Sequence, residues 1–103
     1  RNNNEKGRLI GMTPIIIYLP AALQGLADNQ AQLKLTAQTV NEAFMQIARQ
    51  HDLLAKRILT RGGQLRPFVN VFLDEQDIRH LHGLETPLDG YREMTIVASV
   101  AGG

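Results

Sequence analysis

An amphipathic helix that begins near residue 39 is the feature that most constrains the fold. Thr39 and Glu42 fit a capping box, in which the threonine side chain accepts a hydrogen bond from the backbone N–H three residues later and the glutamate reaches back. Apolar residues then recur at the spacing of one helical face: Val40, Ala43, Phe44, Ile47 and Ala48. A second helical stretch follows and is expected to end at Gly62-Gly63; its apolar residues are Leu53, Leu54, Ile58 and Leu59.

Strand-like segments lie on both sides of this helix, at residues 14–19, 32–36, 68–73 and 93–100. We expect a loop at residues 21–30, with a turn at Asp28-Asn29, and a further short strand at Ile78-Arg79. This order predicts an α+β domain in which one main helix packs across a mixed sheet. The ubiquitin-like β-grasp has the same order of elements, and its first and last strands lie parallel in the centre of the sheet.

Length and composition limit the classes of function. The 103 residues suffice for one hydrophobic core, which we place in residues 13–103, and the polar residues 1–12 are interpreted as a disordered leader or a cloning remnant. A net charge of +1 argues against nucleic-acid binding and against a polybasic membrane anchor. The absence of cysteine excludes disulfides, thiolate catalysis and cysteine-ligated metals, and fits a cytoplasmic location.

The side chains offer no catalytic or metal-binding constellation. His80 and His82 lack a third ligand at a diagnostic spacing, and Ser99 has no base at a recognisable distance in the sequence. The acidic residues after position 73 do not continue into a calcium-binding loop. We therefore expect no catalytic residue, no bound metal or cofactor, and no enzyme activity of the chain itself; any reacting group is expected at the chain terminus.

The sequence ends in Ala101-Gly102-Gly103, which suggests such a terminus. Glycine has no Cβ, so a partner's walls can approach this backbone closely, and a slim peptide can enter a narrow active-site crevice. The terminal carboxylate is ionised at neutral pH and can attack an activated phosphate if another protein supplies ATP, metal and geometry. A frayed tail without function is the alternative interpretation.

Several segments resemble the ThiS/MoaD ubiquitin-like sulfur carriers. The similarity lies in Phe68-Val69-Asn70-Val71-Phe72, in the turn at residues 83–90 and in the ending at residues 95–103, and it extends over residues 14–103. It is greatest toward carriers that serve cysteine biosynthesis or thiocarboxylate siderophores. Two positions depart from the family pattern, Tyr91-Arg92 after the turn and Ala98 near the tail, and both bear on the identity of the partner.

The resemblance implies a carrier cycle. An E1-like enzyme, using ATP and Mg²⁺, would adenylate the Gly103 carboxylate, and a sulfur donor (a sulfurtransferase or sulfide) would convert it to a thiocarboxylate. A cysteine synthase homologue would accept the sulfur, and a metalloprotease would release the new amino acid. Two other roles stay open: a ubiquitin-like modifier conjugated through Gly103, and a non-covalent β-grasp subunit.

A carrier also needs a surface on which its partners dock. If Phe72 faces outward, it can join Val97 and Tyr18 in an apolar patch on the sheet, and such patches often mark interaction sites. Burial of these side chains under loops is the alternative.

Overall fold

A computed structural model of the chain describes residues 11–99. Within these residues, five strands, three α-helices and three short 3₁₀ turns follow one another in the order β1 (Thr13–Tyr18), α2 (Ala21–Gln24), a turn (Gly25–Ala27), β2 (Gln32–Ala37), α3 (Val40–Gln50), α4 (Asp52–Ile58), β3 (Val69–Leu73), β4 (Gln76–Asp77), two turns (Ile78–His80 and Gly83–Glu85) and β5 (Glu93–Ala98). Residues 1–10, most of the expected leader, lie outside the described residues, as do residues 100–103.

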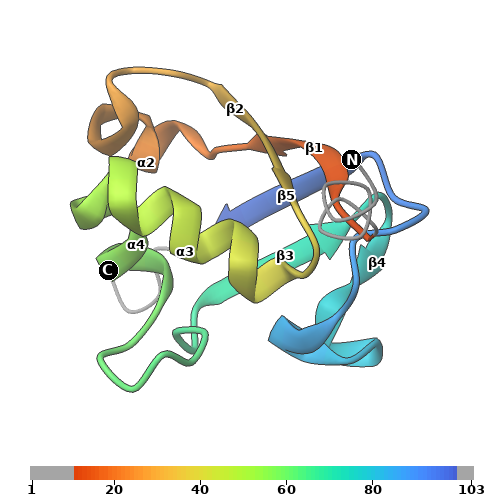
Figure 1. The fold of residues 1–103 in the computed structure, drawn as a ribbon. Coiled ribbons are helices and arrows are strands. Elements are labelled where there is room, and N and C mark those ends of the chain that lie inside the picture. The colour runs from red at the N-terminus through yellow and green to blue at the C-terminus, as the bar shows by residue number, and fades with distance from the viewer. Residues whose placement is uncertain (1–10, 100–103) are drawn as a thin grey trace.

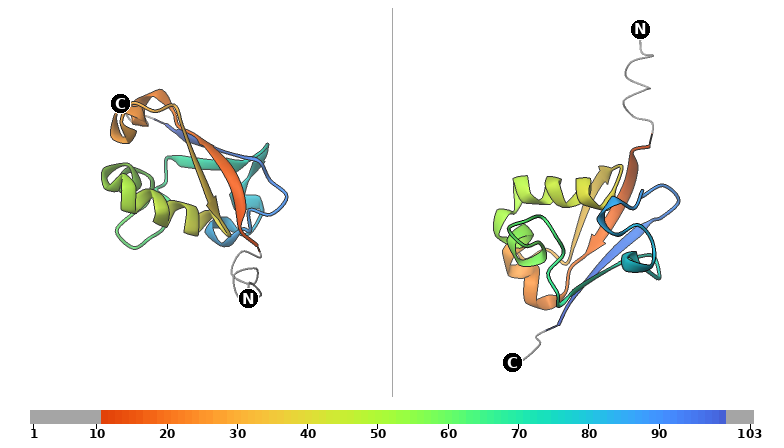
Figure 2. Two further views of the ribbon diagram at one scale, coloured as in Figure 1. Left: turned by 45° about the horizontal axis from the view of Figure 1, so that its top comes forward. Right: turned by 90° about the horizontal axis from the view of Figure 1, so that it is seen from below.

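The strands form one mixed sheet in the order β2-β1-β5-β3-β4 (Figure 1). The first and last strands, β1 and β5, pair in parallel, with Tyr18 opposite Thr95, whereas the other neighbouring strands are antiparallel. Figure 2 shows α3 and α4 together on one side of the sheet. This is the β-grasp arrangement that the order of elements predicted.

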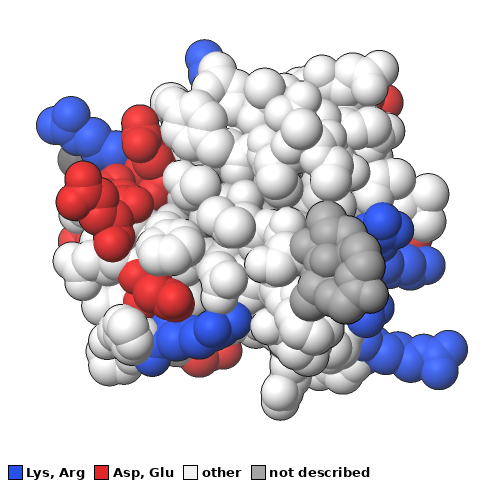
Figure 3. Space-filling view, turned by 180° about the vertical axis from the view of Figure 1, so that it is seen from behind, with Lys and Arg blue, Asp and Glu red and all other residues white. Residues whose placement is uncertain are grey.

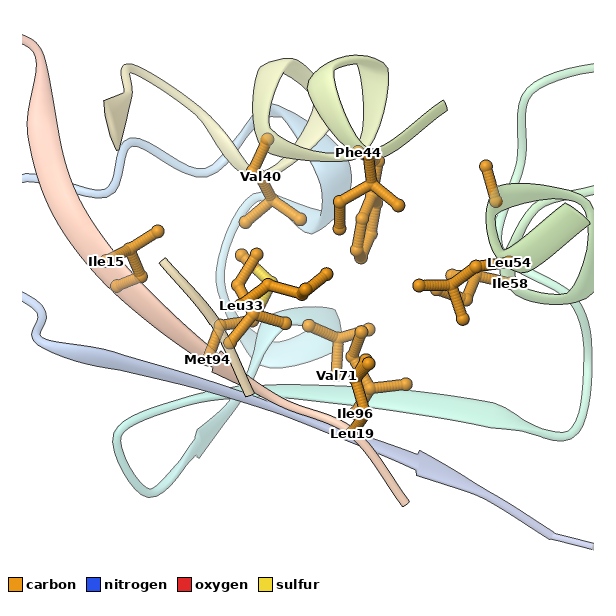
Figure 4. Packing of buried hydrophobic residues seen from close by; sticks show 14 of the residues in the cluster. Ile15, Leu19, Leu33, Val40, Phe44, Leu54, Ile58, Val71, Met94 and Ile96 are labelled. Atoms are coloured by element: carbon orange, nitrogen blue, oxygen red, sulfur yellow. The ribbon is translucent and has the colours of Figure 1, made fainter. Parts of the chain in front are cut away.

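The core lies between α3 and the inner face of the sheet. Alternation along each strand places one set of side chains inward, which buries Ile15 and Ile17 of β1 and Met94 and Ile96 of β5. The apolar stripe of α3 covers them, and Figure 4 shows Phe44 pointing from α3 into this cluster. The helical periodicity predicted from sequence is therefore confirmed here, and Leu33 of β2 is also buried in this cluster.

The capping box at the start of α3 is present. The Thr39 Oγ1 atom accepts a hydrogen bond from the Glu42 backbone N–H at 3.1 Å. In a capping box the glutamate accepts from the backbone N–H of the cap residue, here Thr39. In this structure the Glu42 Oε1 atom accepts instead from the backbone N–H of Gln38, one residue earlier, at 2.7 Å. The backbone N–H of Val40 donates a hydrogen bond to the carbonyl of Thr86 at 3.1 Å, which connects the start of α3 to the loop before β5.

Residues 21–30 are not a simple loop, and this prediction was wrong. They contain α2 and a 3₁₀ turn, which bury Leu23 and Ala27 against the core. The side chain of Gln24 donates to the carbonyl of Leu19 at 3.0 Å, which closes the segment on the end of β1. The turn at Asp28 and Asn29 is confirmed, since both residues have positive φ angles, 55° and 62°.

Two further boundaries differ from the prediction. The second helical stretch ends at Ile58, not at Gly62-Gly63, because Leu59 is extended and bridges to Leu65. Ile78-Arg79 belongs to a 3₁₀ turn and not to a strand. The Asp77 Oδ1 atom accepts from the Arg79 backbone N–H at 2.8 Å and so caps this turn immediately after β4.

Candidate functional site

The candidate site is the end of β5, from which the chain leads toward its terminal glycines. Ala98 is paired with Val69 across the sheet, and the backbone N–H of Ser99 donates to the carbonyl of Phe68 at 2.9 Å. β5 is therefore held by β3 as far as Ser99, the last described residue. Ala101, Gly102 and Gly103 lie outside the described residues, so the structure does not test their predicted role.

The anchoring of β5 follows from its place in the sheet. It pairs with β1 on one side and with β3 on the other, and its inward side chains Met94 and Ile96 are almost completely buried. A strand with both edges hydrogen-bonded and one face in the core is held firmly against thermal motion. The residues that follow β5 therefore start from a fixed point on the molecule.

A hollow of about 390 Å³ lies beside the end of β5. It is enclosed by α2, α4, the segment before β3 and the last residues of β5: Ala22, Leu23, Arg57, Arg66, Pro67, Phe68, Val69, Ala98 and Ser99. Phe68 is 56% exposed. Sequence reasoning missed Arg57 and Arg66 here, because they are far apart from Ser99 in the sequence and only the fold brings the three residues together.

The outer face of the sheet carries the predicted docking residues. Phe72 on β3 and Tyr18 on β1 both lie opposite Thr95 of β5, so the three residues form one row across the sheet. Val97, which is 40% exposed, lies opposite Asn70, one diagonal step from Phe72 and within reach of an aromatic side chain. Phe72 and Val97 thus share the face and the neighbourhood that the sequence predicted for them.

Tyr18 shares this face but is directed elsewhere. Its hydroxyl donates to the Glu93 Oε2 atom at 3.4 Å, which draws the ring toward the start of β5, whereas Val97 lies toward the end of that strand. The structure therefore brings Phe72 and Val97 together, whereas the Tyr18 side chain, in the same row as Phe72, is directed toward Glu93 and away from Val97. Partner binding by this surface stays a prediction.

The turn of residues 83–90, which carried part of the family resemblance, has a structural role. Thr86 is buried; its hydroxyl donates to the carbonyl of Gly83 at 2.7 Å and accepts from the backbone N–H of His82 at 2.9 Å. Leu88 is completely buried, and its backbone N–H donates to the carbonyl of Gln38. This motif therefore closes the core beside α3.

Side-chain chemistry gives no second candidate in residues 11–99. Within that range no group of three or more His, Cys, Asp or Glu residues could hold a metal ion. His80 and His82 are exposed. Asp74 has a structural role, because its Oδ1 atom accepts hydrogen bonds from the backbone N–H groups of Arg92 and Glu93 and so holds the start of β5. Nor does any helix in that range have the length and apolar character to cross a membrane.

Comparison with known proteins gives a consistent result. The sequence profile of the ThiS family matches residues 17–103. A protein of Archaeoglobus fulgidus named as a candidate sulfur carrier is 34% identical over 91 residues, which cover 86% of this chain and 98% of the relative. The sulfur carrier protein CysO of Mycobacterium tuberculosis is 23% identical over an equally long match with the same coverage.

Solved structures agree with the sequence relatives. The small archaeal modifier protein 1 of Methanosarcina acetivorans superposes with a TM-score of 0.77 at 28% identity, over 89% of this chain and 98% of that one. A BexX/CysO complex from Amycolatopsis orientalis contains a chain that superposes with a TM-score of 0.77 at 26% identity, over 86% of this chain and 99% of that one.

Proposed function

The chain belongs to the ThiS family, and from this membership we propose that it is a sulfur carrier that works through a thiocarboxylate on Gly103. The observation that carries the proposal is the family match through to residue 103, together with the fixed end of β5, which presents the following residues to a partner. The relatives are small carriers and modifiers, so we assign the catalytic steps to partner enzymes and no bound cofactor to this chain.

The proposed activation has two balanced steps. A Gly103 carboxylate oxygen attacks the α-phosphorus of Mg-bound ATP in an E1-like enzyme; this forms an acyl-adenylate and releases pyrophosphate. Sulfide then attacks the carbonyl carbon and displaces AMP, which leaves a thiocarboxylate; sulfur held as a persulfide on a sulfurtransferase would first be released as sulfide by a thiol reductant, which is oxidised to a disulfide. The cysteine-free chain has no thiol of its own that could intercept the activated carbonyl.

The delivered nucleophile is the anionic terminal sulfur. The likeness to CysO supports a cysteine synthase homologue as the acceptor, with a metalloprotease to release the product. A thiocarboxylate-siderophore pathway is the alternative destination within the same proposal. We place the cycle in the cytoplasm, where ATP and reduced sulfur are both present.

A second candidate is a ubiquitin-like modifier, favoured by the likeness to the small archaeal modifier protein 1. The adenylation step would be the same, but the activated Gly103 carbonyl would then be attacked by a lysine amine of a target protein to form an isopeptide bond. A non-covalent β-grasp subunit is the third role. It predicts that deletion of Gly103 leaves function intact, whereas both tail-based roles predict loss.

Intact mass spectrometry tests the proposal. The full chain is incubated with an E1-like enzyme from the same organism, ATP, Mg²⁺ and sulfide, and the expected result is the mass increase of an oxygen-to-sulfur exchange. A variant that lacks Gly103 is the matched control and should not change in mass. Failure of the wild-type chain to change, with an enzyme that is active on another carrier, would contradict the proposal.

A further inference from the structure

Arg57 and Arg66 line the hollow beside the end of β5, and Arg61 lines a neighbouring hollow. Resting on the proposed function, we propose that these three arginines dock the adenylating enzyme. Arg57, Arg61 and Arg66, named here the tail-end basic patch, would contact an acidic rim around the cleft into which the terminal glycines insert. The patch would therefore determine which end of the carrier approaches the enzyme first.

The patch is built around two neighbouring hollows. The hollow beside Ser99 includes Arg57 and Arg66, and a second one of about 470 Å³ includes Lys56, Arg61 and, again, Arg66. Neither hollow has an aspartate or glutamate among its lining residues. Because the two hollows share Arg66, the cationic side chains form one continuous surface next to the end of β5.

These arginines are available to a partner. Within residues 11–99 the only ion pair joins Lys56 to Asp52, at 3.0 Å, so the three arginines of the patch have no carboxylate partner there. Arg66 is also held in position, since its Nε donates to the carbonyl of Lys56 at 2.8 Å. A guanidinium that is already oriented loses less conformational freedom when it binds a carboxylate.

Acidic residues lie at the other end of the same strand. Glu93 begins β5, and Asp74 is hydrogen-bonded to its backbone N–H, whereas the tail-end basic patch lies beside the strand's end. Figure 3 shows a group of Lys and Arg side chains at one end of this face, Asp and Glu mixed with further Lys and Arg side chains toward the opposite end, and a largely uncharged surface between them. The net charge of the whole chain is only +1, so the tail-end basic patch is a local surplus of positive charge.

This distribution indicates a protein partner with a negative surface. Complementary charge steers two proteins into the correct orientation and raises the rate of association. The exposed Phe68 lines the first hollow together with Arg57 and Arg66, and aromatic and arginine side chains are the ones enriched at the centres of protein interfaces. An apolar centre with a cationic rim fits an acidic protein surface around an apolar contact.

Charge reversal tests the docking role. The double variant Arg57→Glu/Arg61→Glu changes two exposed residues whose side chains make no hydrogen bond or ion pair within residues 11–99. The double variant Lys34→Glu/Arg92→Glu is a control with the same change in net charge near the start of β5. Adenylation is followed by ATP–pyrophosphate exchange with an E1-like enzyme from the same organism, at increasing carrier concentration. Thermal unfolding of each variant confirms that it folds.

The half-saturating concentration of the arginine variant should rise about tenfold at low ionic strength, with an unchanged maximal rate. The difference should shrink at about 0.5 M salt, where screening is strong. A wild-type value for the arginine variant, or an equal rise for the control, would overturn the docking role while leaving the proposed function intact. Exchange that persists without Gly103 would instead overturn the proposed function.

Discussion

At the scale of single residues, Asp74 shows how a polar side chain can fix the start of the functional strand. Its φ is 53°, a left-handed conformation that aspartate and asparagine tolerate better than other non-glycine residues. Its Oδ1 accepts from the backbone N–H groups of Arg92 and Glu93, at 3.2 and 3.0 Å. The acidic turn seen in the sequence is thus part of the support of β5.

We predict that Asp74→Ala lowers the free energy of unfolding by about 1–2 kcal/mol, because it removes two hydrogen bonds and places a less tolerant residue at positive φ. Asp74→Asn should cost less, since the amide oxygen can still accept and asparagine tolerates this conformation. Urea unfolding of both variants measures the difference. Equal stability of Asp74→Ala and the wild type would contradict the structural role.

The cap of α3 gives a second prediction. Thr39→Ala removes the acceptor for the Glu42 backbone N–H and should cost about 1 kcal/mol of stability. Thr39→Ser keeps the hydroxyl and should stay close to the wild type. Thermal unfolding of the two variants compares them directly, and a loss as large for serine as for alanine would show that the methyl group, not the cap, matters at this position.

At the scale of elements, α3 holds the sheet in shape through one face only. Phe44 is 1% exposed, whereas its neighbour Met45 is 51% exposed on the same helix. Phe44→Ala should therefore destabilise the fold by about 3–5 kcal/mol through lost burial and a cavity. Met45→Ala is the matched control and should have little effect on urea unfolding. Similar losses at both positions would contradict the predicted packing of α3.

The outer face of β3 and β5 gives a prediction about partners. Val97→Asp should weaken binding to the E1-like enzyme about tenfold or more, because it places a charge in the apolar pair formed with Phe72. Thr36→Asp, exposed on β2 of the same sheet, is the control. Isothermal titration calorimetry measures both affinities. An unchanged affinity for Val97→Asp would remove this face from the docking surface.

The sequence predicted correctly those helices and strands that the periodicity of their own residues is enough to specify. The stripe from Val40 to Ile47 and the strand-like segments at residues 68–73 and 93–100 could be recognised from local pattern alone, and the structure has α3, β3 and β5 there. Local patterns failed where tertiary contacts decide. The buried Leu23 stabilises a helix in a segment that looked like a loop, and the bridge from Leu59 to Leu65 ends α4 before the glycines.

At the scale of the whole molecule, the fold joins segments that the sequence separates. The parallel pairing of β1 with β5 brings the beginning and the end of the described chain together in the middle of the sheet. The pairing of β3 with the end of β5 and the position of α4 place Arg66 and Arg57 in one hollow with Ser99. No sequence pattern predicts such a cluster, because its members share neither a helix nor a strand, whereas the terminal glycines could be recognised from the sequence directly.

The most direct test of the account is the mass of the C-terminal peptide of this protein when it is purified from its native cells. If the protein is a sulfur carrier, we expect a thiocarboxylate on Gly103 in at least part of the protein, trapped by a thiol-reactive alkylating agent at the moment of lysis. A terminal peptide found only as the free carboxylate, or only joined to lysines of other proteins, would contradict it.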